Sequence, residues 1–185
     1  MPSQFLIRRA AAVINSGGVI AYPTEAVYGL GCDPDDPDAV VRLLSIKQRS
    51  LDHGLIVIAA TIDQLENYLA PMSKSQRQKL VRSWPGPQTW VAPAADRAPV
   101  WLTGKHDTIA VRVTAHPVAS ALCRQCGHGL VSTSANLAGG PPARDVRKVR
   151  RALGDELDYI LNGPVGGLAQ PTPIRDLVTG KILRS

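Results

Sequence analysis

The stretch VIAYPTEAVYGLG, residues 19–31, decides most of the fold prediction. Its first four residues are an apolar run, which predicts a buried strand that ends at Pro23. The glycine-rich continuation predicts a loop that runs on to Pro37. A loop that directly follows a buried strand is a common ligand site in α/β sheets, although Pro and Gly also serve purely structural connections. The stretch therefore predicts a strand and a candidate binding loop.

Helical and strand patterns alternate on both sides of this stretch. Ser3 is placed to cap a helix with one apolar face, which Gly17 and Gly18 end. Apolar spacing predicts further helices over 39–47, 62–69, 73–84, 117–126 and 145–153, strands over 55–60, 89–94, 108–113 and 130–133, and a hairpin over 173–183. The sequence shows no strict βαβ repeat and no long linker. We expect one α/β domain over residues 1–185, a twisted mixed sheet of parallel and antiparallel strands flanked by helices.

Composition places the chain among globular proteins, because 44% of its 185 residues are hydrophobic and 19% are charged. Arg8 and Arg9 follow a short apolar stretch, the reverse of the order in a signal peptide. The three cysteines are an odd number, which favours reduced thiols. We expect a soluble, cytoplasmic monomer with no membrane partner. The net charge of +6 favours anionic partners such as nucleotides or nucleic acid.

Several common catalytic motifs are absent from the sequence. There is no phosphate-binding P-loop and no Gly-x-Ser-x-Gly elbow, and Gly29 and Gly31 lack the third glycine of a dinucleotide fingerprint. Cys123 and Cys126 form one Cys-x-x-Cys pair, with His128 nearby. A zinc site of this type commonly needs a second cysteine pair, and the sequence has none. We therefore predict no metal-ligating side chains, and expect these cysteines to pack in the core or to lie at the surface as thiols.

Three polar segments could bind an anion. Residues 47–49, Lys-Gln-Arg, end a predicted helix, where they either complement its dipole or clamp a phosphate. Residues 132–136 follow a strand and offer hydroxyls and main-chain N–H groups, as a phosphate nest or as an ordinary capping turn. Arg112 interrupts an apolar strand, so it needs an anion or acceptor if it is covered and needs none at an edge.

Taken together and in order, five motifs resemble the YrdC/Sua5 family of threonylcarbamoyl-AMP synthases over nearly the whole chain. These motifs are PTEAVYGL at 23–30, KQR at 47–49, WPGPQT at 84–89, VRV at 111–113 and STSAN at 132–136. The resemblance implies a YrdC-like fold with a concave basic cavity. It implies a nucleotidyltransferase that makes threonylcarbamoyl-AMP and pyrophosphate from L-threonine, bicarbonate and Mg²⁺-bound ATP. The product would then serve the tRNA modification t6A through downstream t6A-modification proteins.

The resemblance also implies the site residues. It implies four catalytic residues that also contact ATP: Lys47, Arg49, Ser134 and Asn136. Its further ATP contacts are His53, Thr108, Pro142 and Arg184. Its L-threonine contacts are Thr24, Arg112, Ser132 and Thr172. The sequence departs from the family pattern on the amino-acid side, with Ala26 where many relatives carry Thr and Ile58 where they carry His.

Two other functions fit parts of the sequence. A basic face could bind tRNA or double-stranded RNA, as in an RNA-binding or ribosome-maturation factor. Only 4% of the residues are aromatic and they form no stacking array, so such binding would depend on charge and shape. A carbamoyl-transfer role inside hydrogenase-maturation proteins would need additional domains, which 185 residues do not hold.

Overall fold

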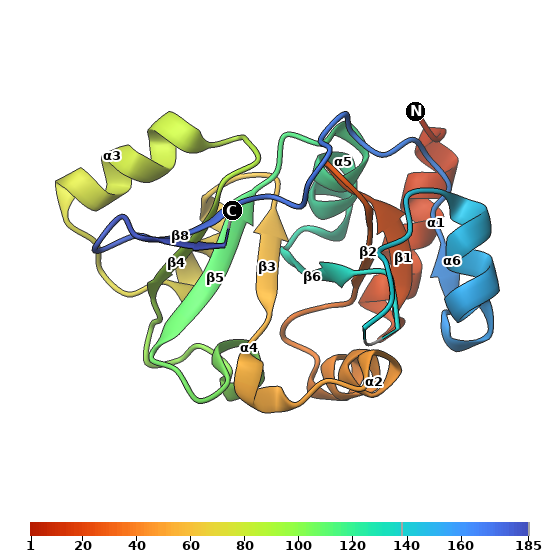
Figure 1. The fold of residues 1–185 in the computed structure, drawn as a ribbon, viewed down its shortest axis with the longest axis horizontal. Coiled ribbons are helices and arrows are strands. Elements are labelled where there is room, and N and C mark those ends of the chain that lie inside the picture. The colour runs from red at the N-terminus through yellow and green to blue at the C-terminus, as the bar shows by residue number, and fades with distance from the viewer. Residues whose placement is uncertain (138, 185) are drawn as a thin grey trace.

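A computed structural model describes residues 1–137 and 139–184. Within these residues, nine strands form one sheet in the order β7-β1-β2-β6-β3-β5-β4-β8-β9 (Figure 1). The strands are β1 Ile20–Pro23, β2 Tyr28–Gly31, β3 Ile56–Ala59, β4 Thr89–Pro93, β5 Thr108–Val113, β6 Leu130–Ser134, β7 Tyr159–Ile160, β8 Ile174–Asp176 and β9 Ile182–Arg184. The pairs β1–β7, β3–β5 and β4–β8 are parallel and the others are antiparallel. The predicted mixed sheet is therefore confirmed.

Helices cover both faces of the sheet and enclose two apolar cores. They are α1 Gln4–Asn15, α2 Pro37–Lys47, α3 Lys74–Ser83, α4 Val100–Thr103, α5 Pro117–Cys126 and α6 Val146–Leu153, with short 3₁₀ helices η1 Leu51–His53, η2 Asp63–Tyr68 and η3 Gly154–Glu156. On one face α1 and α5 pack together, with Ile14 and Leu122 fully buried between them and the strands. On the other face α2 places Val40 and Leu43 in the larger core. The expected arrangement of helices around the sheet is thus observed.

The structure differs from the sequence prediction at four elements, β2, η2, α4 and β7. Strand β2 lies inside the segment predicted to be one loop from Pro23 to Pro37. Its glycines are needed for close packing, because a Cβ on Gly31 would lie 2.5 Å from the carbonyl oxygen of Val131. The predicted helix over 62–69 is the 3₁₀ helix η2, and neither α4 nor the two-residue strand β7 was predicted.

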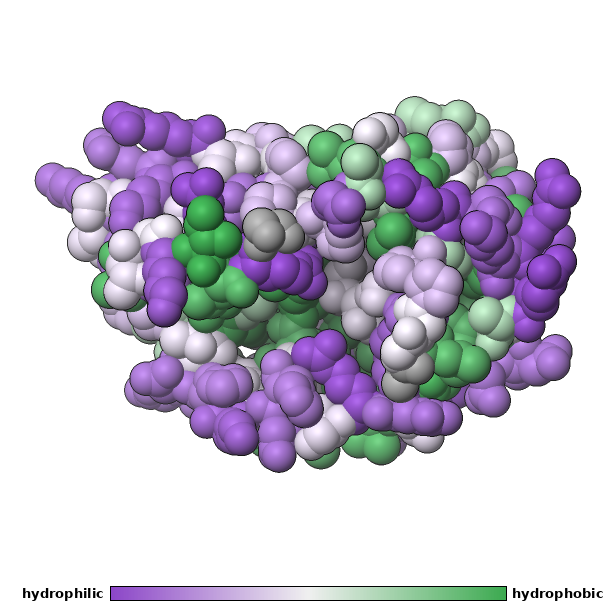
Figure 2. Space-filling model, in the orientation of Figure 1, coloured by the Kyte–Doolittle hydropathy of each residue, from purple (hydrophilic) through white to green (hydrophobic). Residues whose placement is uncertain are grey.

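The middle of the sheet is left open on the face that carries α1 and α5. Successive residues of a strand point to opposite faces, and in β3 Val57 joins the larger core while Ile58 joins the α1–α5 core. Ile56 therefore points to the same face as Ile58, beyond the ends of these two helices. Figure 2 shows a hollow at this position with an apolar floor and a hydrophilic rim. In the part of the chain that the structure describes, no helix is long and apolar enough to cross a membrane.

Candidate active site

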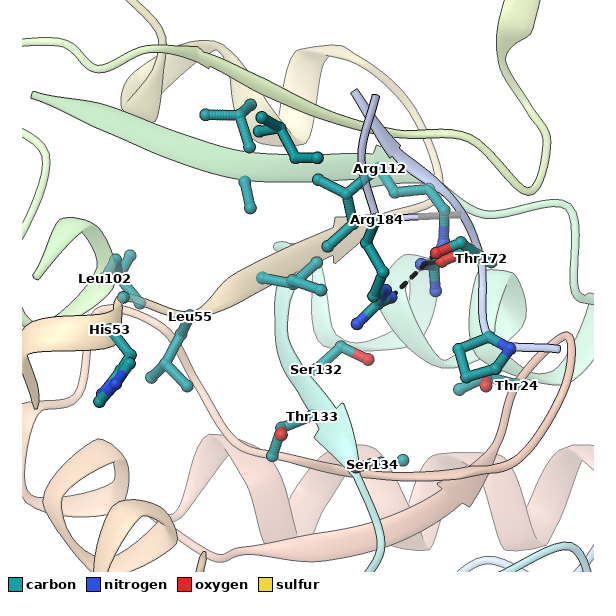
Figure 3. Close-up of a pocket in the computed structure, with 18 of the residues that line it drawn as sticks. Thr24, His53, Leu55, Leu102, Arg112, Ser132, Thr133, Ser134, Thr172 and Arg184 are labelled. Atoms are coloured by element: carbon teal, nitrogen blue, oxygen red, sulfur yellow. Dashed lines mark hydrogen bonds between the residues drawn. The ribbon is translucent and has the colours of Figure 1, made fainter. Parts of the chain in front are cut away.

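The hollow is a cavity of about 490 Å³, within the roughly 300–1,000 Å³ range of small-molecule sites. Its floor is built by strands β3, β4, β5 and β6, and its walls come from η1, α4 and the C-terminal segment that contains β8 and β9. Figure 3 shows His53, Leu55 and Leu102 at one end, and Arg112, Arg184 and Thr172 at the other. The cavity therefore has a more apolar end and a strongly polar end.

The structure brings most of the predicted site residues to this one cavity. Those that line it are Thr24, Arg49, His53, Thr108, Arg112, Ser132, Ser134, Pro142, Thr172 and Arg184. They come from segments up to 160 residues apart (184 − 24) in the sequence. Lys47 and Asn136 are not among the lining residues.

Three guanidinium groups make the cavity cationic. Arg49, Arg112 and Arg184 all line it. Burial, together with the charges of Arg112 and Arg49, lowers the pKa of Arg184 below its ordinary value. Burial also lowers the pKa of Arg49. An arginine stays protonated in proteins despite such shifts. Arg49 donates to the carbonyl oxygen of Gly54 at 3.1 Å. Arg184 donates to the carbonyl oxygen of Thr172 at 2.9 Å. The cavity is thus prepared for an anion.

Of the two alternatives that the sequence left open for Arg112, the structure shows the covered one. Arg112 has a partner that the sequence did not reveal. Its Nη2 lies 3.2 Å from a carboxylate oxygen of Glu25, and both side chains are almost fully buried. Thr114 donates its hydroxyl to the other oxygen of Glu25 at 2.6 Å. On its other side, Nη1 of Arg112 donates to the hydroxyls of Thr172 at 2.7 Å and Thr89 at 3.1 Å. The Nε of Arg112 is buried without a hydrogen-bond partner among the described residues.

Lys47 lies behind the wall of the cavity. Its ammonium group donates to three oxygen atoms at the C-terminal end of β6 and just beyond it: the carbonyls of Ser134 and Asn136 and the side-chain oxygen of Asn136. The predicted Lys-x-Arg pair separates because Gln48 adopts a left-handed conformation, with φ 48°, and ends α2 between the two cations. Arg49 then reaches the cavity, whereas Lys47 does not.

Sequence reasoning missed Glu25, Thr89 and Thr114. Glu25 lies within the quoted binding loop, but its partner is 87 positions away, so no local pattern connects the two. Of the two departures on the amino-acid side, Ala26 lines the cavity, and Ile58 is buried in the α1–α5 core.

Of the two positions predicted for Cys123 and Cys126, the core and the surface, the structure shows the core. Cys123 and Cys126 are buried on α5, and burial raises the pKa of both thiols. Among the described residues, no group of three or more His, Cys, Asp or Glu side chains could hold a metal ion.

Fold and cavity together define a class of α/β protein that carries a deep, cation-rich pocket on the open middle of a mixed sheet. Comparison with known proteins identifies the family. The family model Sua5_yciO_yrdC, described as "Telomere recombination", matches residues 12–185. The chain belongs to this Sua5/YciO/YrdC family.

Relatives over the full length and solved structures agree with this assignment. The chain is 56% identical to the threonylcarbamoyl-AMP synthase of Nitrosococcus oceani over 178 residues, which cover 96% of each protein. It superimposes on P. abyssi Sua5 complexed with L-threonine with a TM-score of 0.91 at 32% identity, covering 97% of this chain and 53% of that one. The chain thus spans about half the length of that protein. It also superimposes on E. coli YciO with a TM-score of 0.87 at 30% identity, covering 100% of this chain and 91% of the other.

Proposed function

We propose that this protein is a threonylcarbamoyl-AMP synthase, which joins L-threonine, bicarbonate and ATP and releases pyrophosphate. The observation that carries the proposal is the single cavity that combines three guanidinium groups, a row of hydroxyls and an apolar end. The full-length similarity to proteins named threonylcarbamoyl-AMP synthase supports the same reaction. Residues 1–185 act as one domain, because a single sheet supplies the whole floor of the cavity.

The nucleotide occupies the more apolar end and the middle of the cavity. Leu55 and Leu102 offer an apolar surface for the adenine ring, with His53 beside them. Arg49 and Arg184 face the phosphates, since guanidinium groups pair well with phosphate oxygens. The remaining ATP contacts proposed are Thr108, Ser134 and Pro142, all of which line the cavity.

The amino acid occupies the polar end. Arg112 lines this end and receives the carboxylate of the amino acid, because a guanidinium group pairs well with carboxylate oxygens. Thr24, Ser132 and Thr172 surround the same end and supply hydroxyl or main-chain contacts. Glu25 does not line the cavity; it fixes the orientation of Arg112 from behind.

The reaction has two bond-forming steps. The neutral amine of threonine attacks the carbon of bicarbonate, and a carbamate forms with loss of water. A carbamate oxygen then attacks the α-phosphorus of ATP, and the bond to the β-phosphate oxygen breaks with release of pyrophosphate. The reactants are anions that repel one another, so Arg49, Arg184 and Arg112 act mainly by positioning them and by stabilising charge.

Mg²⁺ enters this proposal as the companion of ATP. It neutralises part of the phosphate charge when it is bound, and it commonly takes its ligands from phosphates and water with few protein groups. The lining described by the structure supplies hydroxyls and cations but no carboxylate, so the ion would be held by the ATP phosphates and water, with the hydroxyls as the available protein ligands. We therefore assign no metal-ligating side chain.

The product, a reactive mixed anhydride, would be passed to downstream t6A-modification proteins that act on tRNA. We accordingly place this protein in the cytoplasm, as a monomer. The RNA-binding function considered from the charge is not needed for this chemistry.

Pyrophosphate release tests the proposed function. The protein is incubated with ATP, Mg²⁺, L-threonine and bicarbonate, and each component is omitted in turn. We expect release that requires both threonine and bicarbonate, and a loss of about 100-fold or more in Arg49→Met, the range seen when a positioned donor is removed. Lys148→Met, on the exposed face of α6, is the matched control and should retain full activity. Salt-sensitive tRNA binding without any such release would contradict the proposal.

A further inference from the structure

Lys47 is fully engaged inside the protein. Its Nζ lies 2.7 Å from the carbonyl oxygen of Ser134, 2.5 Å from that of Asn136 and 2.8 Å from the side-chain oxygen of Asn136. An ammonium group has three N–H donors, and these three contacts use all of them. The residue is only 7% exposed. No donor of Lys47 is therefore left to point at a ligand in the cavity.

The same contacts define a rigid corner at the end of β6, which we call the 134–136 corner. The side-chain oxygen of Asn136 also accepts a hydrogen bond from the Ser134 hydroxyl at 2.6 Å. The side-chain nitrogen of Asn136 donates to the carbonyls of Leu137 at 3.0 Å and Gly140 at 2.7 Å. Asn136 is thus bonded on both ends of its amide within its own segment, and Ser134 is the member of the corner that lines the cavity.

We propose that Lys47 is a positioning residue that holds the 134–136 corner, so that Ser134 faces the nucleotide, and that it does not contact the phosphates itself. The catalytic part of this inference rests on the proposed function, whereas the structural part does not. We assign phosphate contact in the cavity to Arg49, which lines it, whereas Lys47 does not.

The cost of the alternative supports this assignment. If the ammonium swung out to a phosphate, the main-chain carbonyl of Asn136 would lose the donor that Lys47 supplies. The Ser134 carbonyl and the Asn136 side-chain oxygen would lose their charged donor and keep only the bonds within the corner. Each polar group left unsatisfied in a buried position costs about 1–3 kcal/mol. Burial and the nearby charge of Arg49 lower the pKa of Lys47 to about 8. The protonated form, with all three donors, therefore prevails at neutral pH.

Hydrogen exchange of the ligand-free protein tests the structural part. In Lys47→Met we expect the main-chain amides of the 134–136 corner to exchange at least about tenfold faster than in the wild type, because the corner has lost its three shared bonds. Arg49→Met and the control Lys148→Met should leave this exchange unchanged. An unaltered corner in Lys47→Met would overturn the inference, whatever the enzyme catalyses, so its failure is distinct from a failure of the proposed function.

Kinetics test the catalytic part. Because Arg49 and Arg184 remain in Lys47→Met, we expect kcat to fall about 100-fold while KM for ATP changes less than about fivefold, the pattern of a misplaced group. Lys47→Arg should not restore kcat, because a planar guanidinium cannot direct donors to three oxygens around one point. Restoration by Lys47→Arg, or a loss confined to KM for ATP, would indicate direct phosphate contact and overturn the inference.

A double substitution gives a further check. Lys47 and Asn136 act through the same corner, so their effects should not be additive. We expect Lys47→Met/Asn136→Ala to have a kcat/KM within about threefold of the more damaged single variant. Losses that multiply would mean that the two residues act separately, which contradicts a shared corner.

Discussion

Replacing Glu25 with Gln removes the negative charge that compensates the buried guanidinium of Arg112. Glu25 is 7% exposed and Arg112 is 5% exposed, so water screens neither charge effectively. Gln has nearly the same shape, and it can still accept the Thr114 hydroxyl that lies 2.6 Å from Glu25. The substitution therefore isolates the charge of this ion pair.

The expected loss of stability follows from this geometry. Removing one partner of a buried ion pair costs about 3–5 kcal/mol, because the other charge stays buried without compensation. Gln keeps part of the hydrogen bonding, so we expect Glu25→Gln to lower the free energy of unfolding by about 2–4 kcal/mol. For a domain of this size, roughly 2–4 °C of melting temperature corresponds to each kcal/mol. The melting temperature should fall by about 5–15 °C.

Urea and thermal unfolding, followed by circular dichroism, measure this change. Glu66→Gln is the matched control, because Glu66 pairs with Arg77 at 3.1 Å on the surface, where both side chains are about half exposed. Such pairs contribute about 0–1 kcal/mol. Adding Arg112→Met to Glu25→Gln should recover much of the loss, since an apolar replacement of both partners is often tolerated. A loss below about 1 kcal/mol in Glu25→Gln, equal to the control, would refute the reasoning.

Three further predictions concern the cavity and its support. In Gly29→Ala the new Cβ would lie 3.3 Å from Thr24 Cγ2 and 3.5 Å from Ser132 Oγ. Because it would crowd the threonine end, KM for threonine should rise about tenfold while kcat is nearly kept. An unchanged KM for threonine would mean that threonine binds elsewhere. In Arg184→Met, KM for ATP should rise about tenfold or more, because a charge-assisted phosphate contact is lost; a normal KM for ATP would remove this residue from the site. The pKa of Lys47 is about 8 in the folded protein against an ordinary 10.5, so between these values the unfolded chain binds more protons. The free energy of unfolding of the wild type, relative to that of Lys47→Met, should therefore rise with pH across this window by at most about 1.4 kcal/mol per pH unit. If urea titrations give a difference between the two proteins that does not change with pH, the lowered pKa of Lys47 is excluded.

Local patterns in the sequence predicted most of the elements that build the cavity. The apolar periodicity placed α5 at Pro117–Cys126 and β5 at Thr108–Val113, as the structure has them. Asp145 was predicted to cap a helix, and it accepts a hydrogen bond from the main-chain N–H of Lys148. These elements are set by interactions between near neighbours, which a sequence displays directly.

What escaped prediction depends on contacts between distant residues or on single backbone angles. Strand β2 contains Gly29 and Gly31, which are poor strand formers, and its extended form is fixed by the pairing with β1 and β6. The partner of Arg112 required the fold to bring Glu25 beside it. The different directions of Lys47 and Arg49 follow from one left-handed residue, Gln48, which is not a glycine and gives no signal in the sequence.

The central claim is that this cavity couples the amino group of threonine to bicarbonate and then to the α-phosphate of ATP. The most direct measurement is the mass of the adenylate formed from ¹³C-bicarbonate, L-threonine, ATP and Mg²⁺. We predict threonylcarbamoyl-AMP one mass unit heavier than the product made from ordinary bicarbonate, together with stoichiometric pyrophosphate. An adenylate that contains threonine but no carbon from bicarbonate, or pyrophosphate release without any adenylate, would contradict the account.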